Sequence, residues 1–189
     1  MDINTETIPT LRTEHYFLRG LEKKDAESLY QILKNETTMK YITPHPIQSL
    51  IEMREKIIDY LQGFKDEKEI PWVIVHRESN NVIGIFRLHK LHMWHKKAEL
   101  GAIIHPDFQN SGVMSQVLER ALAYAFNEIG LNRIVGDIFS GNVASRALLK
   151  KFGFIKEGVL RQTDFDGKHF HNTEVYSMLK PEYEKRLKN

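Results

Sequence analysis

The order of strand-like and helix-like patterns is the feature that most constrains how this chain can fold. Short runs rich in β-branched and aromatic residues predict strands, and apolar residues three and four apart predict helices. One strand is followed by two helices, three strands, a helix, a strand, a helix and two strands. This order implies a mixed sheet in an α/β or α+β domain. Strands are expected near 16–19, 72–75, 82–86, 98–104, 133–139 and 170–179, with one more before Asp166.

Local signals mark where these elements begin and end. Asp25 is expected to cap the first helix, and Ser49 with Glu52 fits a capping box at the start of the second. Gly130 stands where the end of the third helix is expected. The dipeptide Asp166-Gly167 is a strong hairpin signal between the last two strands.

Composition narrows the class of protein. The 189 residues contain no repeat and no Pro/Gly-rich linker, so 1–189 is expected to form a single domain. The lack of cysteine excludes disulfides, thiolate metal sites and a cysteine nucleophile. A net charge of +2 is too small to indicate nucleic acid as a partner. Without a signal-peptide pattern or an apolar run long enough for a bilayer, a cytoplasmic protein without a membrane partner is expected.

Two junctions between a strand and a helix carry the functional signal. Gln109 to Ser115 follows a strand and opens a helix, where unpaired backbone N–H groups and the helix dipole favour an anion. Gly112 lets a phosphate approach the backbone closely. The alternative is an ordinary loop with a helix start. The second junction, Asn142-Val143-Ala144-Ser145, leads to Phe152-Gly153-Phe154, and its alternative is a plain asparagine N-cap.

Taken together, the two junctions resemble the GNAT superfamily of acetyltransferases. The coenzyme loop of that family reads Gln/Arg-x-x-Gly-x-Gly/Ala, and its second motif ends in a helix followed by Gly-Phe. Gln109 and Gly112 match the loop, whereas Met114 departs from it and is expected to place a long side chain near the pyrophosphate. The resemblance covers about 11–180 and is greatest for the ribosomal-protein N-terminal acetyltransferases. That branch is indicated by Leu11-Arg12-Thr13-Glu14, Lys97 to Gly101, and Tyr124 to Arg133.

The resemblance implies a fold, a co-substrate and a binding site. The fold is a mixed, mostly antiparallel central sheet of about seven strands with about four helices. The co-substrate is acetyl-CoA, and its acetyl group passes directly to a primary amine. Main-chain groups of Ile103 and Ile104 are expected to pair with the pantetheine arm, which also hydrogen-bonds Asn142. The phosphates are expected on Gln109, Asn110, Ser111, Gly112, Val113, Met114 and Ser115.

Two residues are the catalytic candidates. Glu99 lies in the middle of an apolar strand, with Gly101 and Ile103 on the same face, and is the candidate general base, acting through a water. Its alternative is a glutamate that faces solvent or pairs with a nearby lysine. By resemblance to the ribosomal branch, Ser145 is the candidate proton donor to the CoA thiolate, and its alternative is a serine that only completes the helix start. Asp137 is a weaker candidate, because a salt bridge or solvent exposure explains it equally well.

The acceptor is less well defined by the sequence than the coenzyme. A protein N-terminal amine, perhaps of a ribosomal protein, is the leading hypothesis. A small amine such as a polyamine or amino sugar is one alternative, and a non-catalytic acyl-CoA-binding protein is another. The acceptor pocket is expected between Thr37 to Pro46 and Leu160 to His171. Acidic walls there would favour a polyamine. A homodimer is implied by the resemblance alone.

A histidine pattern raises the question of a metal. His89, His92 and His95 recur at every third position. The segment 88–96 is expected to be a strand end and a loop, with no carboxylate or cysteine at ligand spacing. No metal site is therefore expected.

Overall fold

The computed structural model describes residues 7–188, and in this part of the chain eight strands form one sheet. Their order across the sheet is β1-β2-β3-β4-β5-β6-β8-β7. Each neighbouring pair is antiparallel except β5 with β6, which run parallel. The mixed, mostly antiparallel sheet expected from the sequence is confirmed. The strands are β1 Leu11–Arg12, β2 Tyr16–Gly20, β3 Ile70–His76, β4 Val82–His92, β5 Lys97–Ile104, β6 Arg133–Phe139, β7 Ile155–Phe165 and β8 Phe170–Leu179.

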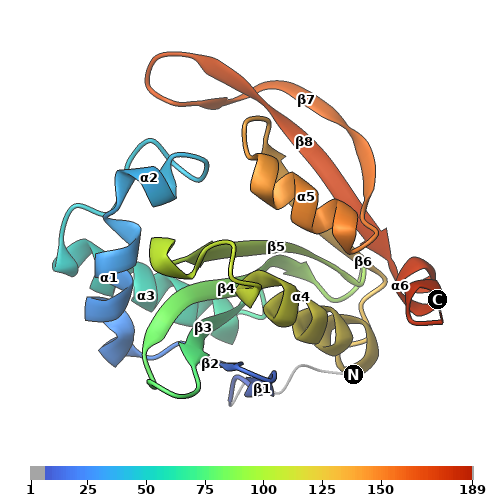
Figure 1. Ribbon diagram of the computed structural model, residues 1–189, viewed down its shortest axis with the longest axis horizontal. Coiled ribbons are helices and arrows are strands. Elements are labelled where there is room, and N and C mark those ends of the chain that lie inside the picture. Colours follow the sequence, from blue (N-terminus) through green and yellow to red (C-terminus); the bar gives the residue numbers. More distant parts are fainter. Residues whose placement is uncertain (1–6, 189) are drawn as a thin grey trace.

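Helices cover both faces of this sheet (Figure 1). On one face α1 and α3 pack against each other and against β4 and β3, while on the other α4 packs against β1 and β2. A π-helical turn, Tyr124–Glu128, continues α4, and 3-10 turns cover Lys23–Asp25 and Pro106–Phe108. The α-helices are α1 Ala26–Leu33, α2 Glu36–Met39, α3 Leu50–Lys65, α4 Val113–Ala123, α5 Val143–Lys151 and α6 Lys180–Arg186.

The central strand β3 shows why the sheet has two covered faces. Its side chains alternate between two apolar cores, with Trp72 and Ile74 on the α4 side and Val73 and Val75 on the α1 and α3 side. All four side chains are fully buried or nearly so. A strand buried on both faces reads as a continuous apolar run, which is the pattern that 72–75 shows.

The eight strands and six α-helices of residues 7–188 exceed the expected seven and four. The additional elements are β1, α2 and α6. The first two contain two and four residues, which is too short for a periodic pattern to be seen. Helix α6 is held by Tyr183, which is buried and stacks on Phe126 with 4.9 Å between ring centroids.

The helix boundaries follow the predicted signals with one correction. Ser49 accepts a hydrogen bond from the Glu52 N–H at 3.1 Å, and Gly130 has φ of 78° at the end of the third predicted helix, as expected. Asp25 lies at the predicted N-cap position of α1, but its side chain makes no hydrogen bond to the start of that helix. Its buried carboxylate instead accepts hydrogen bonds from the Arg19 guanidinium at 2.6 and 2.8 Å and from the Glu22 N–H at 2.9 Å, because these donors lie on the strand side of the turn.

Candidate active site

The parallel strands β5 and β6 separate after three residue pairs. Lys97, Ala98 and Glu99 pair with β6, whereas β5 continues to Ile104 and remains paired with β4 along its other edge. From Leu100 onward, no strand in the described residues pairs with the β6-facing edge of β5. Ile103 and Ile104 lie on this open stretch. Unpaired strand edges accept an extended ligand as an added strand.

The start of α4 follows this open edge and has the geometry of an anion site. Gly112 is the N-cap residue of α4 and has φ of 85°; because glycine has no side chain, no side-chain group of this residue covers the helix start. Asn110 is also in the left-handed region, with φ of 58°, and the Ser111 hydroxyl donates to the Phe108 carbonyl at 2.6 Å. Within residues 7–188 no group accepts a hydrogen bond from the N–H of Gly112 or Met114. Such free N–H groups at the positive end of a helix dipole suit a phosphate.

The side chains of this segment are directed in different ways. Val113 is buried and Met114 packs against the apolar core, so both offer mainly their backbone N–H groups to a ligand. That the long Met114 side chain lies near the pyrophosphate stays a prediction. Gln109 is exposed, and the Ser115 hydroxyl lies on the first turn of α4.

A lysine that the sequence analysis missed reaches the same helix start. The Lys151 ammonium, from the last turn of α5, donates to the Ser115 hydroxyl at 3.2 Å. It adds a positive charge beside the N-terminus of α4, where an anion would bind. The only signal in the sequence is the Lys150-Lys151 pair, which alone reads as a basic last turn of a helix.

The start of α5 brings Asn142 and Ser145 together at the end of β6. The Asn142 Oδ1 atom accepts a hydrogen bond from the Ser145 N–H at 3.1 Å, so the N-cap interpretation is confirmed for this oxygen. No described residue hydrogen-bonds the Asn142 amide nitrogen or the Ser145 hydroxyl. Both groups are partly exposed and remain able to bind a ligand.

Glu99 belongs to a group of carboxylates from three strands. Its carboxylate pairs with the Lys90 ammonium at 2.8 Å, which is the lysine partner considered as its alternative role. Glu99 is opposite Val135 in register, so Asp137, two residues further along β6, shares its face of the sheet. Desolvation, and then the nearby charge of Glu99, raise the pKa of Asp137, and Asp164 on β7 contributes in the same direction.

Lys90 reaches Glu99 from an irregular point in β4. Its φ of 47° lies in the left-handed region, and the register with β5 shifts between His89 and His92. The hydrogen bond to Glu99 raises the pKa of Lys90, so the ammonium stays charged beside the carboxylate. Glu99 therefore has a partner and also faces an open cavity.

This cavity has a volume of about 710 Å³. The two segments expected to form the acceptor pocket both line it, through Tyr41 to His45 on one side and Thr163 to Asp166 on the other. Its walls carry charges of both signs, so they are not the uniformly acidic walls that would favour a polyamine. The carboxylates are Glu52, Glu99, Asp137, Asp164 and Asp166, and the cations are Lys40, Lys56, Arg87 and Lys90.

Asp164 is a second residue that the sequence analysis did not single out. The pairing of β7 with β8 jumps from Leu160 with Thr173 to Asp164 with His171, which marks a bulge in β7. The buried Thr173 hydroxyl donates to Asp164 and also bonds the Thr163 hydroxyl. A bulge re-aims the side chains that follow it, and here it directs Asp164 to the cavity.

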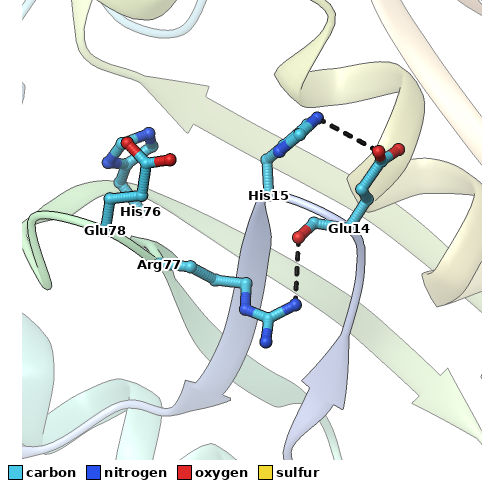
Figure 2. Close-up of a pocket in the computed structure, with 5 residues that line it drawn as sticks. All are labelled: Glu14, His15, His76, Arg77 and Glu78. Carbon is cyan, nitrogen blue, oxygen red and sulfur yellow. Dashed lines mark hydrogen bonds and ion pairs between the residues drawn. The ribbon is translucent and has the colours of Figure 1, made fainter.

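A second, smaller hollow lies elsewhere on the surface (Figure 2). It measures about 230 Å³ and is lined by Glu14, His15, His76, Arg77 and Glu78. Arg77, the residue after β3, donates to the Glu14 carbonyl at 3.0 Å, so this contact ties the end of β3 to the turn between β1 and β2. None of the candidate site residues line it.

The histidine pattern forms no metal centre in residues 7–188, where no group of three potential ligands could hold a metal ion. His92 and His95 contact each other with 4.2 Å between ring centroids, whereas His89 lies apart in the large cavity. The prediction that 88–96 is a strand end and loop is partly wrong, because β4 extends to His92. No helix of the described chain has the length and apolar character to cross a membrane.

Comparison with known proteins gives a consistent result. The family model described as an acetyltransferase (GNAT) domain matches residues 15–155. The chain is 33% identical over 173 residues to the uncharacterized N-acetyltransferase YoaA of Bacillus subtilis (strain 168), covering 92% of this chain and 98% of the relative. It is 32% identical over 176 residues to the putative ribosomal N-acetyltransferase YdaF of the same organism, covering 90% and 94%.

A solved structure extends this comparison to the fold. The spermidine N-acetyltransferase from Vibrio cholerae, in complex with CoA and spermine, aligns with a TM-score of 0.81 and 27% identity. The alignment covers 89% of this chain and 98% of that chain. Residues 15–155, which match the family model, include β5, β6 and the starts of α4 and α5.

Proposed function

The chain belongs to the GNAT acetyltransferase family and is an N-acetyltransferase, and we propose that it moves an acetyl group from acetyl-CoA directly to a protein N-terminal α-amine. The observation that carries the proposal is the separation of β5 from β6 next to the start of α4. The open edge suits the amide groups of an extended pantetheine arm, and the helix start suits the phosphates at its end. The site residues below are part of this proposal.

For the coenzyme, we propose main-chain contacts to pantetheine from Ile103 and Ile104 and a side-chain contact from the Asn142 amide nitrogen. The phosphates would lie against the helix start at Gly112, with the Lys151 ammonium beside them. The remaining members of the proposed phosphate loop are Gln109, Asn110, Ser111, Val113, Met114 and Ser115.

For the chemistry, we propose direct attack of a neutral amine on the thioester carbon. The C–N bond forms as the C–S bond breaks, without an acyl-enzyme intermediate. Because an α-amine is largely protonated below a pKa of about 7.7–8.0, Glu99 accepts its proton through a water. The Ser145 hydroxyl, beside the departing CoA thiolate, supplies a proton or hydrogen bond to the sulfur.

The balance of charges in the cavity supports a peptide as the acceptor. Four cations and five carboxylates lie among its wall residues, so the charges nearly cancel and give little net attraction for a ligand that carries several positive charges. The relative YdaF is named as a putative ribosomal N-acetyltransferase, which agrees with this choice.

A polyamine is the second candidate. It is favoured by the grouping of Glu99, Asp137 and Asp164, and by the spermine in the Vibrio cholerae structure.

A panel of acceptors tests the proposal. Purified protein is incubated with acetyl-CoA and short peptides with free N-terminal alanine or serine, polyamines, and amino sugars, and release of the CoA thiol is followed. We expect the highest kcat/KM for a peptide. A higher kcat/KM for spermidine would favour the second candidate, a polyamine acetyltransferase. No thiol release with any amine would contradict acetyl transfer to these classes of acceptor.

Two substitutions at Asn142 separate its cap from its proposed contact with pantetheine. Asn142→Ala is expected to raise the KM for acetyl-CoA about tenfold, because it removes a hydrogen bond. It should also lower Tm by about 2–4 °C, since losing an N-cap costs roughly 1 kcal/mol in a chain of this size. Asn142→Asp keeps the cap oxygen but not the amide donor, so it should raise KM without lowering Tm. An unchanged KM in both variants would exclude the contact.

The proposed role of Lys151 predicts an effect that depends on salt. Lys151→Ala should raise the KM for acetyl-CoA about threefold to tenfold at low ionic strength, and less at 0.5 M salt, because an exposed charge is screened. Lys150→Ala is the matched control, since it removes the same charge from the neighbouring exposed position on α5. Equal effects of the two variants would show that only the overall charge of the helix matters.

A further inference from the structure

His89 is one of the polar residues that line the cavity, and the proposed function assigns it no role. It lies on β4 directly opposite Glu99, and Arg87 of the same strand is opposite Gly101. A Cβ atom added to Gly101 would lie 3.3 Å from the His89 Nε2 atom. The imidazole therefore leans over the space that Gly101 leaves free by having no side chain. This position is on the open stretch of β5, next to the proposed site of acetyl transfer.

The imidazole is neutral at physiological pH. Burial and then the charge of Arg87 lower the pKa of His89 to about 4, with Lys90 acting in the same direction and Glu99 opposing them. Of its two ring nitrogens, one then donates a hydrogen bond and the other accepts one. No hydrogen bond to this ring is made by any residue between 7 and 188, although the ring faces the cavity. Its hydrogen-bonding capacity is available to a ligand.

We propose that His89 binds the first peptide group of the acceptor and thereby selects a peptide over a polyamine. This inference rests on the proposed function. An attacking amine within reach of Glu99 places the next atoms of its chain beside His89, the cross-strand neighbour. In a peptide these atoms include the carbonyl and N–H of the first peptide bond, which suit a neutral imidazole. In a polyamine they are methylene groups, which offer it nothing.

The first test compares two substitutions of His89 with two acceptors. His89→Phe keeps an aromatic ring but no hydrogen-bonding atom, and it should raise the KM for an N-terminal alanine peptide about tenfold while kcat changes less than threefold. His89→Gln keeps one donor and one acceptor and should stay within about threefold of the original KM. The KM for spermidine should not change in either variant. His92→Phe, at an exposed position three residues away, is the control.

The second test changes the acceptor and does not depend on whether His89→Phe folds. The same peptide is prepared with an ester in place of its first amide, which removes the N–H and weakens the carbonyl as an acceptor. The unmodified enzyme should lose about tenfold in kcat/KM with the ester, and His89→Phe should lose less than threefold. If His89→Phe does not fold, the unmodified enzyme should still discriminate against the ester, and His89→Gln should discriminate to a similar extent.

The outcomes separate this inference from the proposed function. Acetylation of the peptide with equal kcat/KM for amide and ester would overturn the role of His89 and leave the proposed function standing. So would an unchanged peptide KM in a folded His89→Phe variant. Acetylation of spermidine but of no peptide would overturn both.

Discussion

Replacing Glu99 with glutamine is expected to lower kcat by roughly 10²–10³-fold at neutral pH, with the KM for acetyl-CoA changed less than threefold. The size of the loss follows from removing a general base, whose contribution is typically 10²–10⁴-fold. The fold should tolerate the change, because the Lys90 ammonium that pairs with Glu99 is largely exposed and such pairs contribute little to stability. Steady-state kinetics with a peptide acceptor at pH 7 and pH 9 measure the effect.

Asp137→Asn is the matched comparison, since it neutralises the neighbouring carboxylate on the same face. We expect a smaller loss of kcat, about tenfold. If Asp137→Asn has the larger effect, the proton passes to Asp137 instead, a carboxylate whose pKa is raised by desolvation and by the nearby charge of Glu99. Unchanged kcat in Glu99→Gln at both pH values would exclude Glu99 as the base.

The raised pKa of Asp137 also has a consequence for stability. The folded state holds the Asp137 proton more tightly than the unfolded state, so the stability contributed by this group falls as pH rises through the folded pKa. Where the carboxylate is ionised, its charge is less favourable in the folded state than in the unfolded state, because it is desolvated and lies near Glu99. Asp137→Asn is therefore expected to be at least as stable as the original protein at pH 7. A clear loss of Tm would indicate a structural role for the carboxylate.

Where the sequence pattern was strong, it predicted the elements closely. The predicted strands 133–139 and 170–179 coincide with β6 and β8, because β-branched and aromatic residues alternate there between clear turn signals. The same signals placed Gln109 to Ser115, the proposed phosphate loop, between a strand and α4. They also placed Asn142 at the start of α5, where its side chain caps the helix.

The features that were not predicted depend on contacts between distant parts of the chain. Strand β4 continues through His89 to His92 only because β5 pairs with it, and its own residues show no regular alternation there. Lys151 reaches Ser115 from another helix, and the bulge that aims Asp164 at the cavity is defined by the pairing of β7 with β8. The spacing of residues in the sequence does not encode such contacts. The cavity walls therefore could not be predicted from the sequence, whereas the position of the proposed phosphate loop could.

Gly112→Asp is expected to raise the Kd for CoA on the order of 10²-fold without unfolding the protein. Gly112 has φ of 85°, and an added Cβ would meet no atom within 4 Å, so the folded protein has room for the side chain. Asp tolerates the left-handed region better than most residues, and a negative charge is favourable at a helix N-terminus. The same charge would repel the pyrophosphate. At 4 Å this repulsion is about 1 kcal/mol in water and about 4 kcal/mol at an effective dielectric constant of 20.

Gly112→Asn isolates that repulsion, because asparagine has nearly the same shape and the same tolerance for positive φ without the charge. We expect it to bind CoA within about tenfold of the original protein when measured by titration calorimetry. The difference between the two variants should shrink at high ionic strength, since salt screens a partly exposed interaction. Adding Lys151→Ala to Gly112→Asp should cost less than the sum of the two single changes, because both act on the same phosphates. Equal CoA affinities for Gly112→Asp and Gly112→Asn would place the pyrophosphate away from α4 and overturn the proposed binding site.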